Sequence, residues 1–285
     1  MIRAVPGWLT PALLLLSLMS PVLARAEGET PAKSLGERAM DTVRYLSEDV
    51  GTRPAGSPAD RRAAQYVADQ FASMGYDVTL DPFSFQVRTR GTTQNVIASA
   101  PNEDPTLPLV IVGGHYDSVP TGPGANDNAS GTAAVIELAR VLAVDPIPGV
   151  VVRFVGFGAE EIGLLGSQHM VDTLSPADRS RLQVAISMDM LSYGEEPAFH
   201  GSDPWLSHAL ARAQSQGWDP VIMPPSYARM SDHGPFLAAG LPGIFFYWTE
   251  DPCWHLACDV SSRVNPEAIE LMDAIAIELI RIAAG

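Results

Sequence analysis

The chain has 285 residues, of which 46% are hydrophobic and 18% are charged, and its formal net charge is −15. This length and hydrophobic content are sufficient for one large domain with a buried core. The excess of acidic residues argues against nucleic acid and anionic membrane surfaces as partners.

The first segment has the pattern of an export signal. Arg3 precedes an apolar stretch over residues 9–18, and residues 24–26 read Ala-Arg-Ala, the small-x-small form of a cleavage site. We therefore predict a cleaved signal peptide over residues 1–26 and a single domain over residues 27–285, secreted or periplasmic. An uncleaved anchor is the alternative, but the stretch is shorter than the about 20 residues that a bilayer requires. No second apolar run is long enough to span, so we expect no membrane anchor after cleavage.

The next segments alternate between helical and extended patterns. Apolar residues at helical spacing predict helices over residues 34–49 and 59–74, which a Gly/Pro loop separates. Residues 77–87 alternate between apolar and polar side chains, which is typical of an outer, half-exposed strand, with Pro82 as an irregularity.

Short, nearly continuous apolar runs rich in Val and Ile follow. Such runs indicate strands that are buried on both faces of a largely parallel sheet. The runs cover residues 95–100, 107–112, 150–157, 184–190 and 243–248. Helical patterns are predicted over residues 129–143, 164–174, 204–216 and 266–284. Strands that alternate with helices predict a layered α/β fold.

Side chains that bind metals follow the ends of these predicted strands. Because ligands of such sheets gather at the carboxyl ends of the strands, we expect these side chains to meet at one edge. The residues concerned are His115, Glu160, Glu161, Asp189 and His255.

Together with Asp127, this set can hold two zinc ions. Zinc binds neutral imidazole and carboxylate oxygen, and two neighbouring zinc ions need a bridging ligand. Asp127 lies in a tight Gly-rich loop just ahead of a predicted helix, and its two oxygens make it the natural bridge. Glu160 and Glu161 are adjacent, so that one can bind metal while the other faces the attacking water.

The only two cysteines, Cys253 and Cys258, bracket His255. In an exported protein we expect them to form a disulfide that restrains the loop carrying this ligand. Two free thiols and a thiolate zinc site remain the alternatives, because sequence alone does not show the geometry.

In their order and spacing, these segments resemble those of the zinc exopeptidase family that includes bacterial leucyl aminopeptidase and the glutaminyl cyclases. The resemblance covers about residues 35–284 and implies one zinc peptidase catalytic domain with a three-layer α/β/α sandwich and a central, mostly parallel mixed sheet. It is carried by residues 51–57, 114–118, 124–131, 159–167, 188–190 and 231–233, and by His255 with Asp259.

The resemblance also implies a role for each residue of the site. His115 and Asp189 would bind one zinc ion, Glu161 and His255 the other, and Asp127 would bridge them through a loop whose Asp127-Asn128 peptide is cis in relatives. Glu160 would be the general base, and Asp117 would orient the imidazole of His115. The segment after the last histidine departs from the common His-Thr-Pro-x-Asp-Thr pattern, which affects loop rigidity and pocket shape.

The implied activity is that of an exported zinc aminopeptidase acting on peptides with a free N-terminus, and we expect a monomer. Tyr227, Ser231 and His233 are the candidate substrate-binding residues, and a hydrophobic N-terminal residue is the expected substrate. Phe245 and Phe246 are expected to belong to the core. A single-zinc glutaminyl cyclase, a carboxypeptidase or dipeptidase of the same fold, and a non-catalytic metal-binding domain remain the alternatives.

Overall fold

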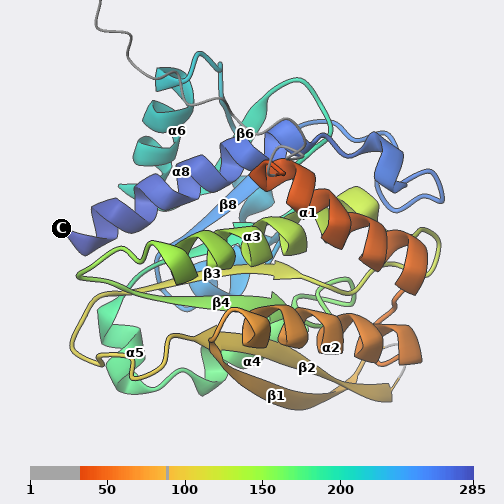
Figure 1. Ribbon diagram of the computed structural model, residues 1–285, viewed down its shortest axis with the longest axis horizontal. Coiled ribbons are helices and arrows are strands. Elements are labelled where there is room, and N and C mark those ends of the chain that lie inside the picture. The colour runs from red at the N-terminus through yellow and green to blue at the C-terminus, as the bar shows by residue number, and fades with distance from the viewer. Residues whose placement is uncertain (1–32, 88–89) are drawn as a thin grey trace, which may run out of the picture. The chain divides into compact units, whose positions relative to one another are not determined.

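A computed structural model describes residues 33–87 and 90–285, and the predicted signal peptide lies outside these residues. Eight strands form one mixed sheet (Figure 1). They are β1 (Asp77–Gln86), β2 (Arg90–Ser99), β3 (Leu109–His115), β4 (Val151–Phe157), β5 (Leu182–Met188), β6 (Pro197–Gly201), β7 (Val221–Ile222) and β8 (Gly243–Trp248). Their order across the sheet is β1-β2-β4-β3-β5-β8-β6-β7. The neighbours β4, β3, β5 and β8 run parallel, whereas β1, β2 and β6 each pair antiparallel with a neighbour.

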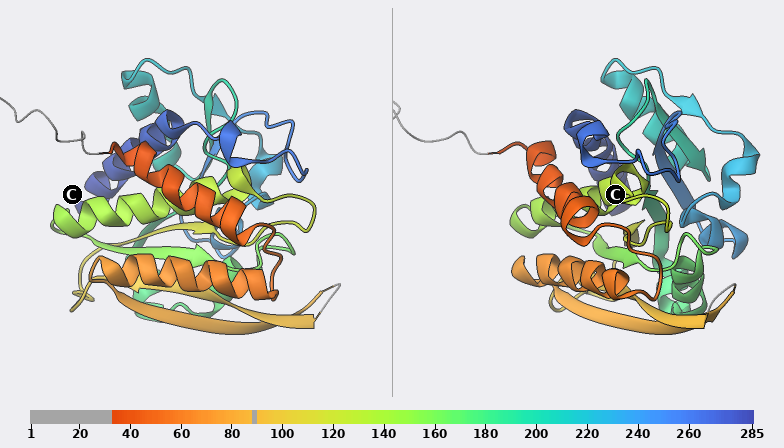
Figure 2. Two further views of the ribbon diagram at one scale, coloured as in Figure 1. Left: turned by 45° about the vertical axis from the view of Figure 1, so that its right-hand side comes forward. Right: turned by 90° about the vertical axis from the view of Figure 1, so that its right-hand side faces the viewer.

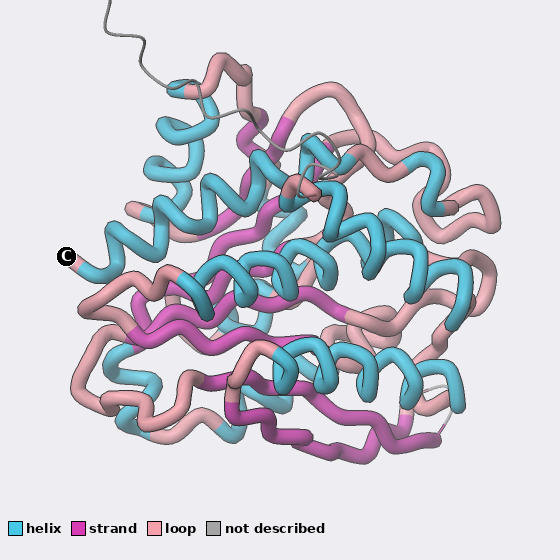
Figure 3. Tube along the Cα trace, viewed as in Figure 1, coloured by secondary structure: helices cyan, strands magenta, loops and turns pink. Residues whose placement is uncertain are grey.

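Helices cover both faces of the sheet, which confirms the three-layer α/β/α sandwich (Figures 2 and 3). The helices of one face are α1 (Leu35–Arg44), α2 (Pro58–Ser73), α3 (Gly131–Val144), α6 (Trp205–Ser215) and α8 (Pro266–Ala284). The second face carries α4 (Leu165–Thr173) and α7 (His233–Ala238), and α5 (Pro176–Arg181) leads from α4 into β5. Short helical turns complete the chain: η1 (Tyr45–Val50), η2 (Ala125–Ser130), η3 (Pro225–Arg229) and η4 (Ser261–Arg263).

The central strands are buried on both faces, as their continuous apolar runs predict. In β3, Val110 and Val112 belong to the larger core beneath α1, α2, α3 and α8. Leu109 and Ile111 belong to the smaller core beneath α4 and α7. Since successive side chains of a strand point to opposite faces, both sets must be apolar when helices cover both sides.

Some elements differ from the sequence-based expectation. β2 begins at Arg90 rather than at residue 95, because it pairs with β1 along the full length of that strand. Its first half is partly exposed and lacks the apolar run that marks a buried strand. The helices α5 and α7 and the strands β6 and β7 were not predicted, because they are too short to show a period.

None of the helices that the structure describes is both long and apolar enough to cross a membrane.

Candidate active site

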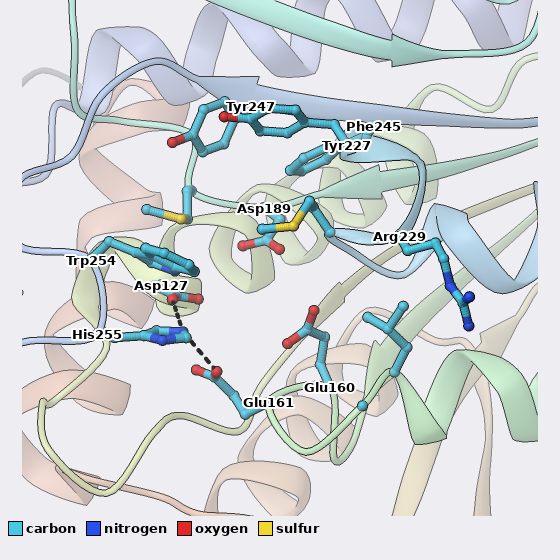
Figure 4. A pocket seen from close by; sticks show the side chains of 14 residues that line it. Asp127, Glu160, Glu161, Asp189, Tyr227, Arg229, Phe245, Tyr247, Trp254 and His255 are labelled. Carbon is cyan, nitrogen blue, oxygen red and sulfur yellow. Dashed lines mark ion pairs between the residues drawn. The ribbon is translucent and has the colours of Figure 1, made fainter. Parts of the chain in front are cut away.

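The carboxyl ends of the parallel strands bring the predicted ligands to one edge of the sheet. His115 is the last residue of β3, and Asp189 directly follows β5. Glu160 and Glu161 lie in the turn after β4, and His255 lies in the loop after β8. Figure 4 shows that most of these side chains converge on one cavity.

Asp127 lies between the two histidines. Its Oδ1 is 3.3 Å from Nε2 of His115, and its Oδ2 is 3.3 Å from Nε2 of His255. Each imidazole has a second carboxylate beside it. Nε2 of His115 is 3.4 Å from Oδ1 of Asp189, and Nε2 of His255 is 3.0 Å from Oε2 of Glu161. The side chains therefore form two groups of candidate ligands that share Asp127.

The donor atoms of this site fit a divalent metal. Ligand atoms of His115, Asp127 and Glu161 all lie within 4.8 Å of one another, as do those of His115, Glu160 and Asp189. Nε2 of His115 and Oδ1 of Asp189 are buried without a hydrogen-bond partner among the described residues. Buried polar atoms without partners are costly, and a cation between them would satisfy both. Imidazole nitrogen and carboxylate oxygen are donors that zinc prefers.

The pKa shifts of the site also fit a group of side chains that binds a cation. Burial raises the pKa of Glu160 well above its usual value, aided by Asp189, and raises that of Glu161 to about 7. Hydrogen bonds to Asp127 and Glu161 raise the pKa of His255 to about 10. A bound cation would favour the deprotonated form of each of these three side chains.

Asp117 supports both the imidazole of His115 and the Glu160–Glu161 turn. Its carbonyl oxygen lies 3.2 Å from Nδ1 of His115, and its Oδ1 lies 3.6 Å from the same nitrogen. The backbone N–H of Glu160 donates to Oδ1 of Asp117 over 3.1 Å, and that of Glu161 donates to Oδ2 over 3.3 Å. The sequence predicted only the contact between Asp117 and the imidazole of His115.

The loop that carries Asp127 is held by a second aspartate. Asp259 accepts the backbone N–H of Asn126 at Oδ1 over 2.7 Å and that of Asp127 at Oδ2 over 3.0 Å. The Asp127-Asn128 peptide bond is cis. Asp259 was visible in the sequence as part of the last motif, but its partners come from a segment more than a hundred residues earlier.

Arg53 is a supporting residue for which sequence reasoning named no role. Its side chain is fully buried and donates to the carbonyl oxygens of Tyr116 over 2.6 Å and Gly124 over 2.7 Å, and also to that of Pro123. It thereby ties the segment after β3, which leads to Asp127, to the loop before α2. Its motif was recognised, but a buried guanidinium surrounded by carbonyl groups leaves no sequence pattern.

Beside the ligands lies a cavity of about 290 Å³ with a largely aromatic wall. Its apolar lining consists of Leu164, Met190, Tyr227, Met230, Phe245, Tyr247 and Trp254. Tyr227 lies there as predicted from its loop position. Phe245 also lines the cavity, whereas Phe246 is buried in the core.

The two other candidate substrate residues lie behind this wall rather than in it. Ser231 Oγ donates to Oδ2 of Asp189 over 2.8 Å, so that it supports a predicted ligand. His233 stacks on Phe245 with ring centroids 5.0 Å apart, and its Nε2 lies 3.1 Å from Nδ1 of His200. Burial lowers the pKa of His233 to about 3, which keeps this imidazole neutral.

The loop after β8 carries His255 between two bonded cysteines. The Sγ atoms of Cys253 and Cys258 form a disulfide, and no free cysteine occurs among the described residues. The indole of Trp254 lies against the imidazole of His255, with ring centroids 4.3 Å apart. Thr121 also donates its hydroxyl to the carbonyl oxygen of His255 over 2.8 Å.

Residues 95–280 match the model of Peptidase family M28. The chain belongs to this family. Aminopeptidase YwaD of Bacillus subtilis is 36% identical over 198 residues, which cover 64% of this chain and 43% of that protein. Leupeptin-inactivating enzyme 1 of Streptomyces exfoliatus is 30% identical over 258 residues, which cover 82% of this chain and 58% of that protein. The chain thus spans about half the length of the curated M28 relatives it matches.

Solved structures share the M28 fold of the chain. The zinc aminopeptidase BSAP of Bacillus subtilis superimposes with a TM-score of 0.77 at 22% identity, over 87% of this chain and 96% of that one. A glutaminyl cyclase of Bacteroides thetaiotaomicron superimposes with a TM-score of 0.73 at 19% identity, over 86% and 97%. The resemblance seen in the sequence is therefore confirmed, and the fold alone does not separate the two activities.

Proposed function

We propose that this M28 chain is a zinc-dependent aminopeptidase that removes a hydrophobic N-terminal residue from peptides. The observation that carries the proposal is the position of Asp127, whose two oxygens face two different histidines at the edge of the cavity. The aminopeptidase names of its relatives support the same reading.

Two zinc ions would be held by the two ligand groups. His115 and Asp189 would hold one ion, Glu161 and His255 the other, and Asp127 would bridge them. When bound, zinc supplies positive charge that polarises the scissile carbonyl, activates water and favours the ionised form of Glu160.

Glu160 is the general base of the proposed reaction. It lines the cavity, and its side chain contacts the ligand group of His115, with Oε2 3.9 Å from Nε2. Glu160 accepts a proton from the attacking water and donates it to the departing amine, so that the proton balance of hydrolysis closes. Asp117 holds the backbone of this residue in place through the hydrogen bond to its N–H.

The shape and charge of the cavity favour the N-terminal end of a peptide. Its aromatic wall suits an apolar side chain, and its volume of about 290 Å³ admits only a short segment of chain. The carboxylates Glu160 and Asp189 lie on the same cavity and provide the negative charge that a free α-ammonium group requires.

We also propose that the protein is exported. The signal-like pattern of residues 1–26 supports a secreted or periplasmic protein whose mature chain begins near Glu27. N-terminal sequencing of the protein from the culture medium or periplasm of an expressing cell tests this directly. A chain that still begins at Met1 would contradict it.

The activity is tested by pairing metal content with turnover on one purified sample. We expect nearly two zinc ions per chain and chelator-sensitive release of leucine from a peptide with an amidated C-terminus. The same peptide with an acetylated N-terminus should not be cleaved. Cleavage of the acetylated peptide would indicate a carboxypeptidase, and one zinc ion with cyclisation of N-terminal glutamine would indicate a cyclase.

The adjacent glutamates provide a matched pair of variants. Glu160→Gln should keep its zinc and lose about 10²- to 10⁴-fold in kcat, as expected for a general base. Glu161→Gln should lose zinc, because its carboxylate, which lies beside His255, is a proposed ligand of the ion. Equal zinc loss in both variants would contradict the assignment of Glu160 as the base and Glu161 as the zinc ligand.

A further inference from the structure

The cavity contains one cationic side chain that the proposed reaction does not use. Arg229 is the only lysine or arginine of the described residues that lines it, whereas its other charged lining groups are His255 and four carboxylates. The chain as a whole carries a formal net charge of −15, so that its general field repels anions. The positive charge of Arg229 therefore affects only a molecule that is bound in or near the cavity.

The guanidinium of Arg229 is unpaired within the part of the chain that the structure describes. Most arginines of the described residues donate to a carboxylate or a carbonyl group, as Arg53 and Arg153 do. Arg229 has no side-chain hydrogen bond and no ion pair with a described residue, although Glu160 lines the same cavity. Figure 4 shows Arg229 on the opposite side of the cavity from Trp254 and His255.

The substrate itself can supply the missing anion. In the proposed aminopeptidase, the aromatic wall takes the first side chain and the carboxylates take the α-ammonium group. A short peptide has one further obligatory charge, the carboxylate at its C-terminus, which lies beyond the scissile bond. Guanidinium groups match carboxylates geometrically and bind them through two parallel hydrogen bonds.

We propose that Arg229 binds a substrate carboxylate on the departing side of the scissile bond, so that the enzyme prefers short peptides with that charge. The inference rests on the proposed function and adds the substrate class. The carboxylate has two sources, the free C-terminus of a dipeptide and an acidic side chain in the second residue. Since Arg229 is exposed, solvent weakens the pair, and we expect an effect of about 3- to 10-fold.

The test compares substrates that differ by a single charge. Leu-Gly is compared with Leu-Gly-amide for the C-terminal source, and Leu-Asp-amide with Leu-Asn-amide for the side-chain source. We expect the wild-type protein to show a KM about 3- to 10-fold lower for the charged member of at least one pair, with kcat little changed. Arg229→Gln should bring that ratio to about one, and Arg229→Lys should restore part of it.

Arg281→Gln is the matched control, because it removes the same charge from an exposed position outside the cavity. It should leave the substrate ratio as in the wild type. A ratio that Arg229→Gln does not change, or that Arg281→Gln changes equally, would overturn the inference. So would a wild-type protein that prefers the neutral member of both pairs.

A binding measurement separates this inference from the proposed function. Calorimetric titration of zinc-loaded Glu160→Gln with Leu-Gly and Leu-Gly-amide, and with the Asp and Asn pair, reports affinity without turnover. A preference for the charged peptide that Arg229→Gln abolishes supports the inference even if the wild type cleaves none of these peptides. Cleavage of the amides without any charge preference in binding would leave the aminopeptidase standing and refute the role of Arg229.

Discussion

The aspartates of the site each use their two oxygens for different partners. Asp127 faces two imidazoles, Asp117 accepts two consecutive backbone N–H groups after β4, and Asp259 accepts those of Asn126 and Asp127. An asparagine at such a position keeps one acceptor and replaces the other with a donor. The site should therefore be sensitive to Asp→Asn changes that leave its volume unaltered.

We expect Asp117→Asn to lower zinc affinity or kcat/KM by about 10- to 100-fold, as is typical for residues that orient metal ligands. The physical reason is that an amide NH₂ cannot accept the N–H of Glu160 or Glu161, so that one of these hydrogen bonds is lost. Zinc affinity is measured by competition with a chromophoric chelator. Asp69→Asn, at an exposed site on α2, is the control and should change nothing. Unchanged affinity and turnover in Asp117→Asn would contradict the orienting role.

Zinc binding should release protons at pH 7. The pKa of His255 is raised to about 10 by its hydrogen bonds to Asp127 and Glu161, so this imidazole is protonated in the metal-free protein. Since zinc requires the neutral ring, binding displaces a proton and the zinc affinity rises with pH up to that pKa. Calorimetric titrations in buffers of different ionisation enthalpy measure the release. Proton uptake, or affinity that falls as pH rises from 6 to 8, would contradict this assignment.

At the scale of elements, the site is held by loops that are tied to one another rather than by a single rigid helix. Arg53 ties the loop before α2 to the segment between β3 and η2. The Cys253–Cys258 disulfide closes a short loop after β8 around His255. These ties limit the motion of the candidate ligands, which come from segments far apart in the sequence.

Replacement of both Cys253 and Cys258 by serine should lower the free energy of unfolding by about 2 kcal/mol, as expected for a loop of this length. It should also weaken the zinc group that contains His255, because the ligand gains conformational freedom. Urea unfolding and zinc content measure the two effects. Reduction of the wild-type protein should reproduce the result, and unchanged zinc affinity would show that the loop is held by its other contacts.

At the scale of the whole molecule, the core contains an acidic group remote from the ligands. Asp273 of α8 is fully buried, and neither of its carboxylate oxygens has a hydrogen-bond partner among the described residues. Burial raises its pKa well above the usual value, and Glu137 and Glu270 add to the effect. The protonated form is therefore the one that the folded protein favours.

This pKa predicts how stability depends on pH. Because the folded-state pKa is above the unfolded one, the contribution is fully present below the unfolded pKa and is lost as pH rises through the folded pKa. We expect the wild type to lose up to about 1.4 kcal/mol per pH unit across that window relative to Asp273→Asn. Urea unfolding between pH 4 and 8 measures the difference, with Asp69→Asn as control. Parallel pH profiles for the wild type and Asp273→Asn would contradict the prediction.

The sequence by itself determined the class of fold and predicted the candidate metal ligands that the fold brings together. Residues such as Leu109 to Val112 are apolar at every position, which local pattern alone identifies as a strand covered on both faces. His115 and Asp189 were placed by their positions at strand ends, because a parallel sheet brings those ends to one edge. The apolar content and the period of a short segment are local properties, so they can be read from the sequence without knowing which segments pack against it.

Only the tertiary structure decided which side chains meet. Ser231 supports Asp189 instead of lining the cavity, His233 pairs with His200 behind Phe245, and Arg229 lines the cavity without a partner among the described residues. The contacts of Ser231 and His233 join segments that are separated along the chain, and the position of Arg229 depends on the orientation of a short turn. Such features leave no local pattern in the sequence. The sequence therefore predicted the candidate metal ligands, whereas the packing of distant loops decided which residues line the cavity.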